Sequence, residues 1–341
     1  MKASCFDYFL PRDYIAQHPL EKRDESRLLI VDRKRGVFKE TLFKDIVNIL
    51  LPSDCIVLNN TKVLPARIFG RKETGARIEF LFIKEYDEGL WEVLVKPQKR
   101  LRENTVVSLP NNIKLKAVRK IVGGRWLVKL FSSSVKSVLK LYGEMPTPPY
   151  IKEELKDKER YQTVYAKKEG AIAAPTAGLH FTRKIISMLK KKGVTVAYLT
   201  LHVGLGTFRP IKANDIEDHK MEEEEFSISR KYATIINKAK KERRRIIAVG
   251  TTVTRALESA AKIIDRGCYI KAGKRKTGLF IQPGYNFKII GGLLTNFHLP
   301  LSTNLVLVSA FGGIELVKKA YAYAIKKKFR FYSFGDAMLI L

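Results

Sequence analysis

The sequence predicts an α/β protein with a mixed, mostly parallel sheet, flanking helices and a small inserted all-β barrel. From residue 160 onward, short apolar runs alternate with longer segments that repeat apolar residues every three to four positions, which is typical of strands alternating with helices. Residues 67–131 instead contain short runs in which apolar and polar residues alternate, as in the strands of a small barrel or sandwich. The apolar run CIVLNN at 55–60 resembles the second half of the chain, so we expect a discontinuous α/β core.

We expect the inserted β-barrel domain at residues 67–146. Its clearest strands are RIEFLFI, LWEVLVK and KLKAVRK, at residues 77–83, 90–96 and 114–120. Turn residues separate the runs at 87–89, 110–112 and 123–124. Serines at 132–134 can cap a short helix, and the proline-rich stretch GEMPTPPY at 143–150 is expected to lead back to the core.

The α/β core is expected at residues 1–66 and 147–341. Thr182 and Ser229 are the predicted N-caps of its first two helices. Helical spacing of apolar residues predicts helices at 181–193, 229–243, 253–265 and 314–328. Apolar runs predict strands at 55–60, 194–203, 245–250, 287–294, 329–334 and 337–341.

The chain is strongly basic. Its 341 residues include 64 Lys and Arg against 34 Asp and Glu, a formal net charge of +30. Such a surface attracts polyanions and favours binding to nucleic acid. A surface rich in charge for thermal stability is the alternative, but such surfaces usually mix both signs. The cationic residues cluster at 96–102, 240–245, 271–276 and 326–330.

Other features favour a cytoplasmic protein. Cys5, Cys55 and Cys268 are isolated, without any CxxC pair, so we expect reduced thiols rather than disulfides or a zinc ribbon. The N-terminal segment is interrupted by charges and does not have the pattern of a signal peptide. The uncharged run 291–314 is long enough to span a bilayer but holds several polar residues, so we expect a core segment of a globular protein.

Three stretches of this basic chain contain no Asp, Glu, Lys or Arg, and each holds one histidine. They are AAPTAGLHFT (173–182, with His180), LTLHVGLGTF (199–208, with His202) and TNFHLPLSTNLVLVSAFGG (295–313, with His298). We expect these neutral segments to line one pocket, in which a neutral imidazole can act as a base. Ordinary core or capping histidines are the alternative. No HxH or HxxxH spacing supports a metal site.

Two glycine-containing motifs follow predicted strands. In AVGTTVTRALESA (248–260), the backbone amides and hydroxyls at Thr251 and Thr252 can bind a carboxylate or phosphate at a helix N-terminus, or serve only as caps. Gly204 and Gly206 permit close approach of a ligand, but the third glycine of a dinucleotide-binding motif is absent. The acidic run HKMEEEEF (219–226) is either a solvated face or a carboxylate for a cationic substrate.

Several longer motifs carry a family resemblance that runs from residue 6 to the C-terminus. They include FDYFLPRDYIAQHPLEKRDESRLLIV, VLNNTKVLPAR, ERYQTVYA, GAIAAPTAGLHFT, TLHVGLGTFRP, VGTTVTRALES, NFHLPLSTNLVLVSAFGG and RFYSFGDAMLI. In this order they resemble the S-adenosylmethionine:tRNA ribosyltransferase-isomerase family of queuosine biosynthesis. The resemblance is weakest inside the β module, at 68–140.

The resemblance implies a mixed α/β fold with an inserted β-barrel domain, and a reaction on tRNA. S-adenosylmethionine would be a co-substrate that donates its ribosyl group to the aminomethyl group of a 7-deazaguanine at the anticodon wobble position. Epoxyqueuosine in tRNA would form, adenine and methionine would leave, and neither a metal nor a redox cofactor would be needed. We expect a monomer without membrane contact. An S-adenosylmethionine-dependent tRNA methyltransferase and a non-enzymatic RNA-binding protein are the alternatives.

The resemblance and the chemistry together indicate site residues. The expected catalytic residues, with acid and base not assigned among them, are His180, His202, His298 and Glu224. The expected substrate-binding residues are Tyr161, Gln162, Thr176, Gly178, Phe181, Gly204, Gly206, Thr207, Thr251, Thr252, Arg255 and Asn296. Aromatic faces for the sulfonium are expected from Phe181, Phe208 or Phe297. Contacts to tRNA are expected from Lys96, Lys99, Arg100, Lys274 and Arg275.

The chain departs from the family pattern at three positions, one of which is Gln282 in FIQPGY, where an aromatic residue is common. Asn60 stands where the family usually has Asp, and Glu222 stands where it usually has His, in a pattern M-H-x-E that Met221 and Glu224 match. We therefore assign no catalytic duty to Asn60 or Glu222.

Overall fold

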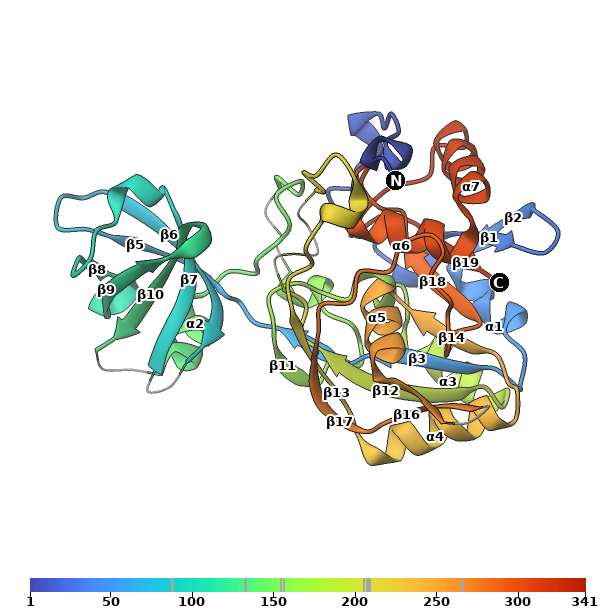
Figure 1. Cartoon of the computed structure of the whole chain (residues 1–341). Coiled ribbons are helices and arrows are strands. Elements are labelled where there is room, and N and C mark those ends of the chain that lie inside the picture. The colour runs from blue at the N-terminus through green and yellow to red at the C-terminus, as the bar shows by residue number, and fades with distance from the viewer. Residues whose placement is uncertain are drawn as a thin grey trace. The chain divides into compact units, whose positions relative to one another are not determined.

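The structure divides the chain into two units (Figure 1). It is a computed structural model that describes residues 1–86, 89–131, 134–153, 155, 157–204, 206, 210–264 and 267–341. Residues 1–62, 148–168 and 174–341 form what we call the α/β unit. Residues 63–147 and 169–173 form what we call the barrel unit.

A mixed sheet forms the centre of the α/β unit. Within the described residues it has nine strands, in the order β17-β13-β12-β3-β14-β18-β19-β1-β2. The central strands β12, β3, β14 and β18 run parallel, and β19 is parallel to β1, whereas the other neighbours are antiparallel. The strands are β1 (Arg27–Asp32), β2 (Val37–Leu42), β3 (Cys55–Asn59), β12 (Thr195–Leu201), β13 (Glu224–Ile228), β14 (Ile246–Val249), β17 (Gly273–Thr277), β18 (Gly292–Asn296) and β19 (Ala337–Ile340).

Helices cover both faces of this sheet. Apolar side chains of α1 and α3 pack on one face, against Ile56, Ile247 and Leu294 among others, while α5 lies against the other face (Figure 1). The helices are α1 (Ile46–Ile49), α3 (Arg183–Lys191), α4 (Arg230–Lys241), α5 (Thr251–Ala260), α6 (Thr303–Gly312) and α7 (Ile314–Lys326). The predicted mixed α/β class is confirmed, with parallel pairing concentrated in the central strands.

The barrel unit contains a closed antiparallel barrel, as the alternating pattern predicts. Ile78, Phe80 and Phe82 of β6 are almost fully buried, so alternate residues of this strand form the barrel core. The barrel order is β10-β7-β6-β5-β8-β9 within the described residues. Its elements are β5 (Arg67–Arg71), β6 (Arg77–Glu85), β7 (Leu90–Lys96), β8 (Val106–Ser108), β9 (Lys114–Ile121), β10 (Arg125–Leu130) and α2 (Val135–Tyr142). Two short ladders complete the structure, β4 (Thr61–Val63) with β11 (Lys168–Ala171) and β15 (Ala261–Ile264) with β16 (Gly267–Ile270).

The predicted helix starts are confirmed by their caps. The Thr182 hydroxyl accepts a hydrogen bond from the backbone amide of Ile185, and the Ser229 hydroxyl accepts one from Tyr232. Gly193, with φ of 95°, follows α3. A left-handed backbone at this position favours glycine, which explains why the helix stops there.

Three predictions about elements are wrong. The helix predicted at 253–265 ends at Ala260, and the chain continues as the hairpin strand β15. The strand predicted at 287–294 starts only at Gly292, because the Glu258 carboxylate accepts the amides of residues 288–290 that a neighbouring strand would otherwise bind. Residues 329–334 form no strand, since Tyr332 has a left-handed φ of 71°.

The long uncharged run divides into two elements, β18 and the buried helix α6. The sequence pattern did not predict α6, nor the strands β1, β2, β13 and β17. Among the described residues, no helix has the length and apolar character that crossing a membrane requires.

Candidate active site

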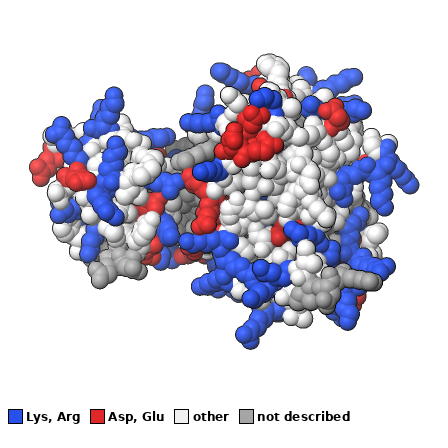
Figure 2. All heavy atoms as spheres, viewed as in Figure 1, with Lys and Arg blue, Asp and Glu red and all other residues white. Residues whose placement is uncertain are grey.

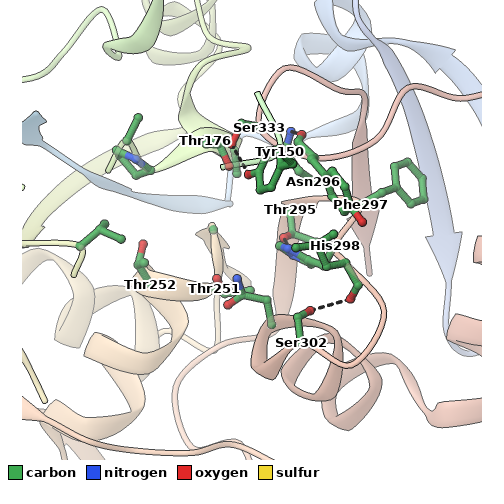
Figure 3. Close-up of a pocket in the computed structure, with 18 residues that line it drawn as sticks. Tyr150, Thr176, Thr251, Thr252, Thr295, Asn296, Phe297, His298, Ser302 and Ser333 are labelled. Atoms are coloured by element: carbon green, nitrogen blue, oxygen red, sulfur yellow. Dashed lines mark hydrogen bonds between the residues drawn. The ribbon is translucent and has the colours of Figure 1, made fainter. Parts of the chain in front are cut away.

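The three neutral segments meet around one cavity in the α/β unit (Figure 3). The cavity has a volume of about 60 Å³ and is lined by residues 174–177 and 295–299 together with Val203. Residues 250–252 at the start of α5 also line it. The segments after β12, β14 and β18 converge because these strands are parallel and their carboxyl ends share one edge of the sheet.

The N-terminus of α5 forms part of the cavity wall. Strand β14 passes into α5 through Gly250, whose φ of 97° permits this sharp turn. The free backbone amides of the first helical turn and its partial positive charge can hold a carboxylate. The Thr252 side-chain oxygen, Oγ1, is buried there without a hydrogen-bond partner among the described residues.

His298 lines this cavity and is neutral. Its Nε2 atom lies 2.7 Å from the Thr295 hydroxyl, and its backbone amide donates to the Tyr321 hydroxyl at 2.9 Å. Burial lowers the pKa of His298 to about 3. At neutral pH the ring is therefore uncharged.

His180 faces a neighbouring, smaller cavity of about 20 Å³. Its Nδ1 atom lies 2.7 Å from the Ser26 hydroxyl, and its Nε2 atom lies 3.2 Å from the Asn296 side-chain nitrogen. The ring is 5% exposed and stacks on Phe43 with ring centroids 5.0 Å apart. Burial lowers its pKa to about 4, and the charges of nearby arginines act in the same direction.

His202 faces a third cavity, of about 320 Å³, at the β17 edge of the sheet. Its Nδ1 atom lies 2.8 Å from the Thr61 hydroxyl. Burial lowers its pKa, with a further lowering from Lys274, although Glu225 acts in the opposite direction. The prediction that the three neutral segments line one pocket is confirmed, but of their histidines His298 lines it, whereas His180 and His202 do not. The backbones of the segments meet, whereas the rings of His180 and His202 face other cavities, where Ser26 and Thr61 are their hydroxyl partners.

Glu224 and Arg255 form a buried ion pair, with both side chains 5% exposed. Glu224 also accepts the backbone amide of Gly204 at 2.9 Å, and Arg255 donates to the carbonyl of Leu279 at 2.9 Å. The pair therefore holds the glycine loop that follows β12 against β13 and α5. Neither side chain lines the cavity at the start of α5. The Arg255 guanidinium therefore pairs with Glu224 and does not reach that cavity.

The remaining predicted substrate-binding residues are divided between cavity and core. Thr176, Thr251, Thr252 and Asn296 line the cavity with His298. Phe297 also lines it, but its fully buried ring packs among Tyr321, Phe329 and Phe331. Outside the cavity lie Tyr161, Gln162, Gly178, Phe181, Gly204 and Gly206. Thr207 and Phe208 lie outside the described residues.

Three of the residues outside the cavity have packing roles. Phe181 is fully buried against Phe43, and Tyr161 is fully buried against Phe334. A side chain at Gly178 would place its Cβ 2.0 Å from the Tyr165 hydroxyl, so this glycine is needed for close packing. Neither aromatic ring presents a free face to a sulfonium.

Sequence reasoning missed Tyr150, Tyr332 and Ser333, which line the cavity. The Tyr150 and Ser333 hydroxyls lie 2.7 Å apart. These residues come from the proline-rich connector and from a segment predicted as a strand, so no periodic pattern marks them. The hydroxyl partners of the histidines were also missed. Only Thr295, three residues before His298, lies close enough in sequence to have been found.

The predicted tRNA contacts lie on exposed basic segments. Lys96, Lys99 and Arg100 are exposed at the end of β7 and in the following turn of the barrel unit. Lys274 and Arg275 belong to the edge strand β17 and line the cavity of His202. Figure 2 shows Lys and Arg side chains on both units and an uncharged area over α5 and α6.

The described residues include no group of three or more His, Cys, Asp or Glu side chains placed to hold a metal ion.

We expect acid to destabilise the fold through His180. Its pKa of about 4 in the folded state lies below the ordinary value of 6.5, so the unfolded chain takes up a proton first as the pH falls. Lowering the pH from 7 to 5 should therefore cost about 2 kcal/mol of unfolding free energy from this side chain. Urea unfolding of the wild type and of His180→Gln at both pH values measures the difference. Equal losses in the two proteins would contradict the expectation, and the exposed His18→Asn variant is the control.

We also expect the Glu224–Arg255 pair to stabilise the α/β unit only as a pair. Arg255→Ala leaves a buried carboxylate uncompensated and should lower the unfolding free energy by about 3–5 kcal/mol. The double variant Glu224→Leu/Arg255→Met should recover most of this loss, since no charge is then buried. Urea unfolding measures both, with the exposed Lys318→Ala as control. If Arg255→Ala is as stable as the wild type, the ion pair does not stabilise the α/β unit.

Comparisons with known proteins identify the family. The model of a queuosine biosynthesis protein family matches residues 3–340. Proteins named S-adenosylmethionine:tRNA ribosyltransferase-isomerase from Halothermothrix orenii and Carboxydothermus hydrogenoformans are each 52% identical to this chain, over 100% of both lengths. A crystal structure of S-adenosylmethionine tRNA ribosyltransferase from Thermotoga maritima has a TM-score of 0.57 and 36% identity, and the match covers 99% of this chain and 100% of that one. The chain therefore belongs to the queuosine biosynthesis protein family of S-adenosylmethionine:tRNA ribosyltransferase-isomerases.

Proposed function

We propose that this enzyme transfers and isomerises the ribosyl group of S-adenosylmethionine onto the aminomethyl-7-deazaguanine at the wobble position of tRNA. Adenine and methionine are released, and epoxyqueuosine forms in the tRNA. The observation that carries the proposal is the uncharged cavity at the start of α5, where a helix N-terminus and a neutral histidine meet. A cytoplasmic location and a monomeric state remain predictions from the sequence.

The cavity suits the chemistry of S-adenosylmethionine. Its methionine carboxylate fits the amides at Thr251 and Thr252, where the α5 N-terminus favours a negative charge. The positively charged sulfonium acidifies the adjacent 5′ carbon, so the reaction needs a base that is unprotonated at neutral pH. We assign this role to His298, because burial keeps its ring neutral and it lines the same cavity.

His298 has the geometry for this role. If its Nε2–H group donates to the Thr295 hydroxyl, the lone pair of Nδ1 is available for the proton. The Tyr321 hydroxyl holds the backbone amide of His298 and so limits movement of the residue. The predicted catalytic roles of His180, His202 and Glu224 remain proposals. For Glu224, the pairing with Arg255 and Gly204 supports a role in holding the loop.

The decisive experiment follows both products of the reaction. Purified enzyme is incubated with ribosyl-labelled S-adenosylmethionine and tRNA that carries the aminomethyl-deazaguanine. We expect free adenine, free methionine and label in the RNA. A methyl group in the RNA together with S-adenosylhomocysteine would indicate a methyltransferase instead. Binding of tRNA without either product would indicate an RNA-binding protein.

We expect His298→Asn to lower kcat by about 100- to 10,000-fold, the range typical for loss of a general base. The Michaelis constant should change little, because the cavity walls are retained. The matched control His18→Asn changes an exposed histidine and should keep wild-type activity. A kcat of His298→Asn within threefold of the wild type would exclude His298 as the base.

We expect the basic segments to bind tRNA through phosphates. Replacing Lys96, Lys99 and Arg100 with Ala should weaken binding and reduce the slope of log K against log salt by about 0.7 for each lost contact to a single-stranded phosphate. Lys274→Ala/Arg275→Ala should act in the same way. The control Lys190→Ala/Lys191→Ala changes two exposed cations of α3. Filter binding at several salt concentrations measures the slopes, and an unchanged slope would remove that segment from the interface.

A further inference from the structure

Two polar atoms of the cavity at the start of α5 are buried without a hydrogen-bond partner among the described residues. They are Asn296 Oδ1 and Thr252 Oγ1, on residues that are 1% and 6% exposed. A buried polar atom without a partner is costly, so such atoms in one cavity indicate a ligand that completes their bonds. Thr251 and Thr252 lie on one side of the cavity and Asn296 on the other (Figure 3).

The orientation of the Asn296 amide is determined by its neighbours. Its nitrogen, Nδ2, lies 3.0 Å from the backbone carbonyl oxygen of Tyr332, which can only accept a hydrogen bond. The same nitrogen lies 3.2 Å from His180 Nε2. A rotated amide would place oxygen against oxygen at Tyr332. Both amide hydrogens are therefore used inside the protein, and Oδ1 is the atom left for the cavity.

His180 maintains this orientation because its Nε2 atom is an acceptor. Burial lowers the pKa of the ring to about 4, so the ring is neutral near pH 7. With Nε2 accepting from Asn296, the ring proton is on Nδ1 and donates to the Ser26 hydroxyl at 2.7 Å. The Ser26 hydroxyl in turn donates to the carbonyl of Arg23 at 3.3 Å. A chain of hydrogen bonds thus leads from the α/β unit's N-terminal segment to the cavity wall.

We propose that Asn296 Oδ1 accepts a hydrogen bond from a nitrogen of S-adenosylmethionine, and that His180 is a positioning residue that holds the amide in this orientation. The inference rests on the proposed function. S-adenosylmethionine offers two such N–H donors, the α-ammonium group of its methionine part and the 6-amino group of its adenine. Carboxylate binding at α5 and N–H binding at Asn296 together orient the co-substrate across the cavity.

The first test measures binding of S-adenosylmethionine by calorimetry. Asn296→Ala should raise Kd by about 10- to 100-fold, whereas the exposed Asn48→Ala of α1 should stay within threefold of the wild type. An unchanged Kd for Asn296→Ala overturns the inference. If the wild type binds no S-adenosylmethionine, the proposed function itself fails, which is a separate outcome.

Two analogues identify the nitrogen. One lacks the α-amino group, and the other has oxygen in place of the 6-amino group. For the wild type, one analogue should bind about tenfold more weakly than S-adenosylmethionine. For Asn296→Ala that same analogue and S-adenosylmethionine should bind alike, because the acceptor is already gone. For each analogue, the loss of affinity relative to S-adenosylmethionine is compared between the wild type and Asn296→Ala. If that loss is the same in both proteins for both analogues, Asn296 contacts neither nitrogen and the inference is wrong.

A pair of variants separates positioning by His180 from catalysis. Gln at position 180 can place its carbonyl oxygen near the site of Nε2 and still accept from Asn296, whereas the shorter Asn reaches only the site of Nδ1. We expect His180→Gln to keep KM and kcat within threefold of the wild type. His180→Asn should raise KM for S-adenosylmethionine about tenfold with a smaller change in kcat. A fall in kcat of a hundredfold or more in both variants at unchanged KM would make His180 the base and overturn its positioning role. Melting curves check that both variants fold.

Discussion

Parallel pairing of β12, β3, β14 and β18 is the constraint on which the candidate site depends. Strands that run in one direction bring their carboxyl ends to one edge of the sheet. The segments after β12, β14 and β18 then meet, although they are separated by tens of residues in the chain. Each contributes differently to the cavity wall: Val203 is apolar, the start of α5 presents a helix N-terminus with two threonines, and Asn296 and His298 are polar.

Two effects keep His180 neutral in this basic chain. A charged imidazole would be disfavoured by burial and by nearby Arg or Lys side chains, and both effects lower the pKa of His180. A neutral ring still requires hydrogen-bond partners, and hydroxyl groups meet this need without adding charge. Ser26, Thr61 and Thr295 provide them for His180, His202 and His298. Of these three partners, only Thr295 belongs to one of the neutral segments.

Much of the fold follows from local patterns in the sequence. Alternation identified the barrel strands β6, β7 and β9, and helical spacing with Thr182 and Ser229 identified the starts of α3 and α4. The errors occur where a distant group satisfies the backbone. Glu258 binds the amides of residues 288–290, an interaction between residues about thirty positions apart that no local pattern shows. The site was predictable to the same extent: neutrality indicated which segments meet, but the direction of each ring depends on a hydroxyl elsewhere in the chain, as with Ser26 and His180.

Tyr332 combines a strained backbone with a place in the cavity wall. A tyrosine with φ of 71° is strained, at a cost of about 1–3 kcal/mol. Glycine would relieve that strain but would also delete a buried ring that lies 4.8 Å from the ring of Tyr150 between centroids, and loss of a large buried side chain costs more than the strain. The carbonyl oxygen of Tyr332 accepts hydrogen bonds from the Asn296 side chain and from the amide of Gly335. A glycine at position 332 would hold this carbonyl less firmly, because its backbone has more accessible conformations. Few residues could replace this tyrosine, because the position requires both a left-handed backbone and a large buried ring.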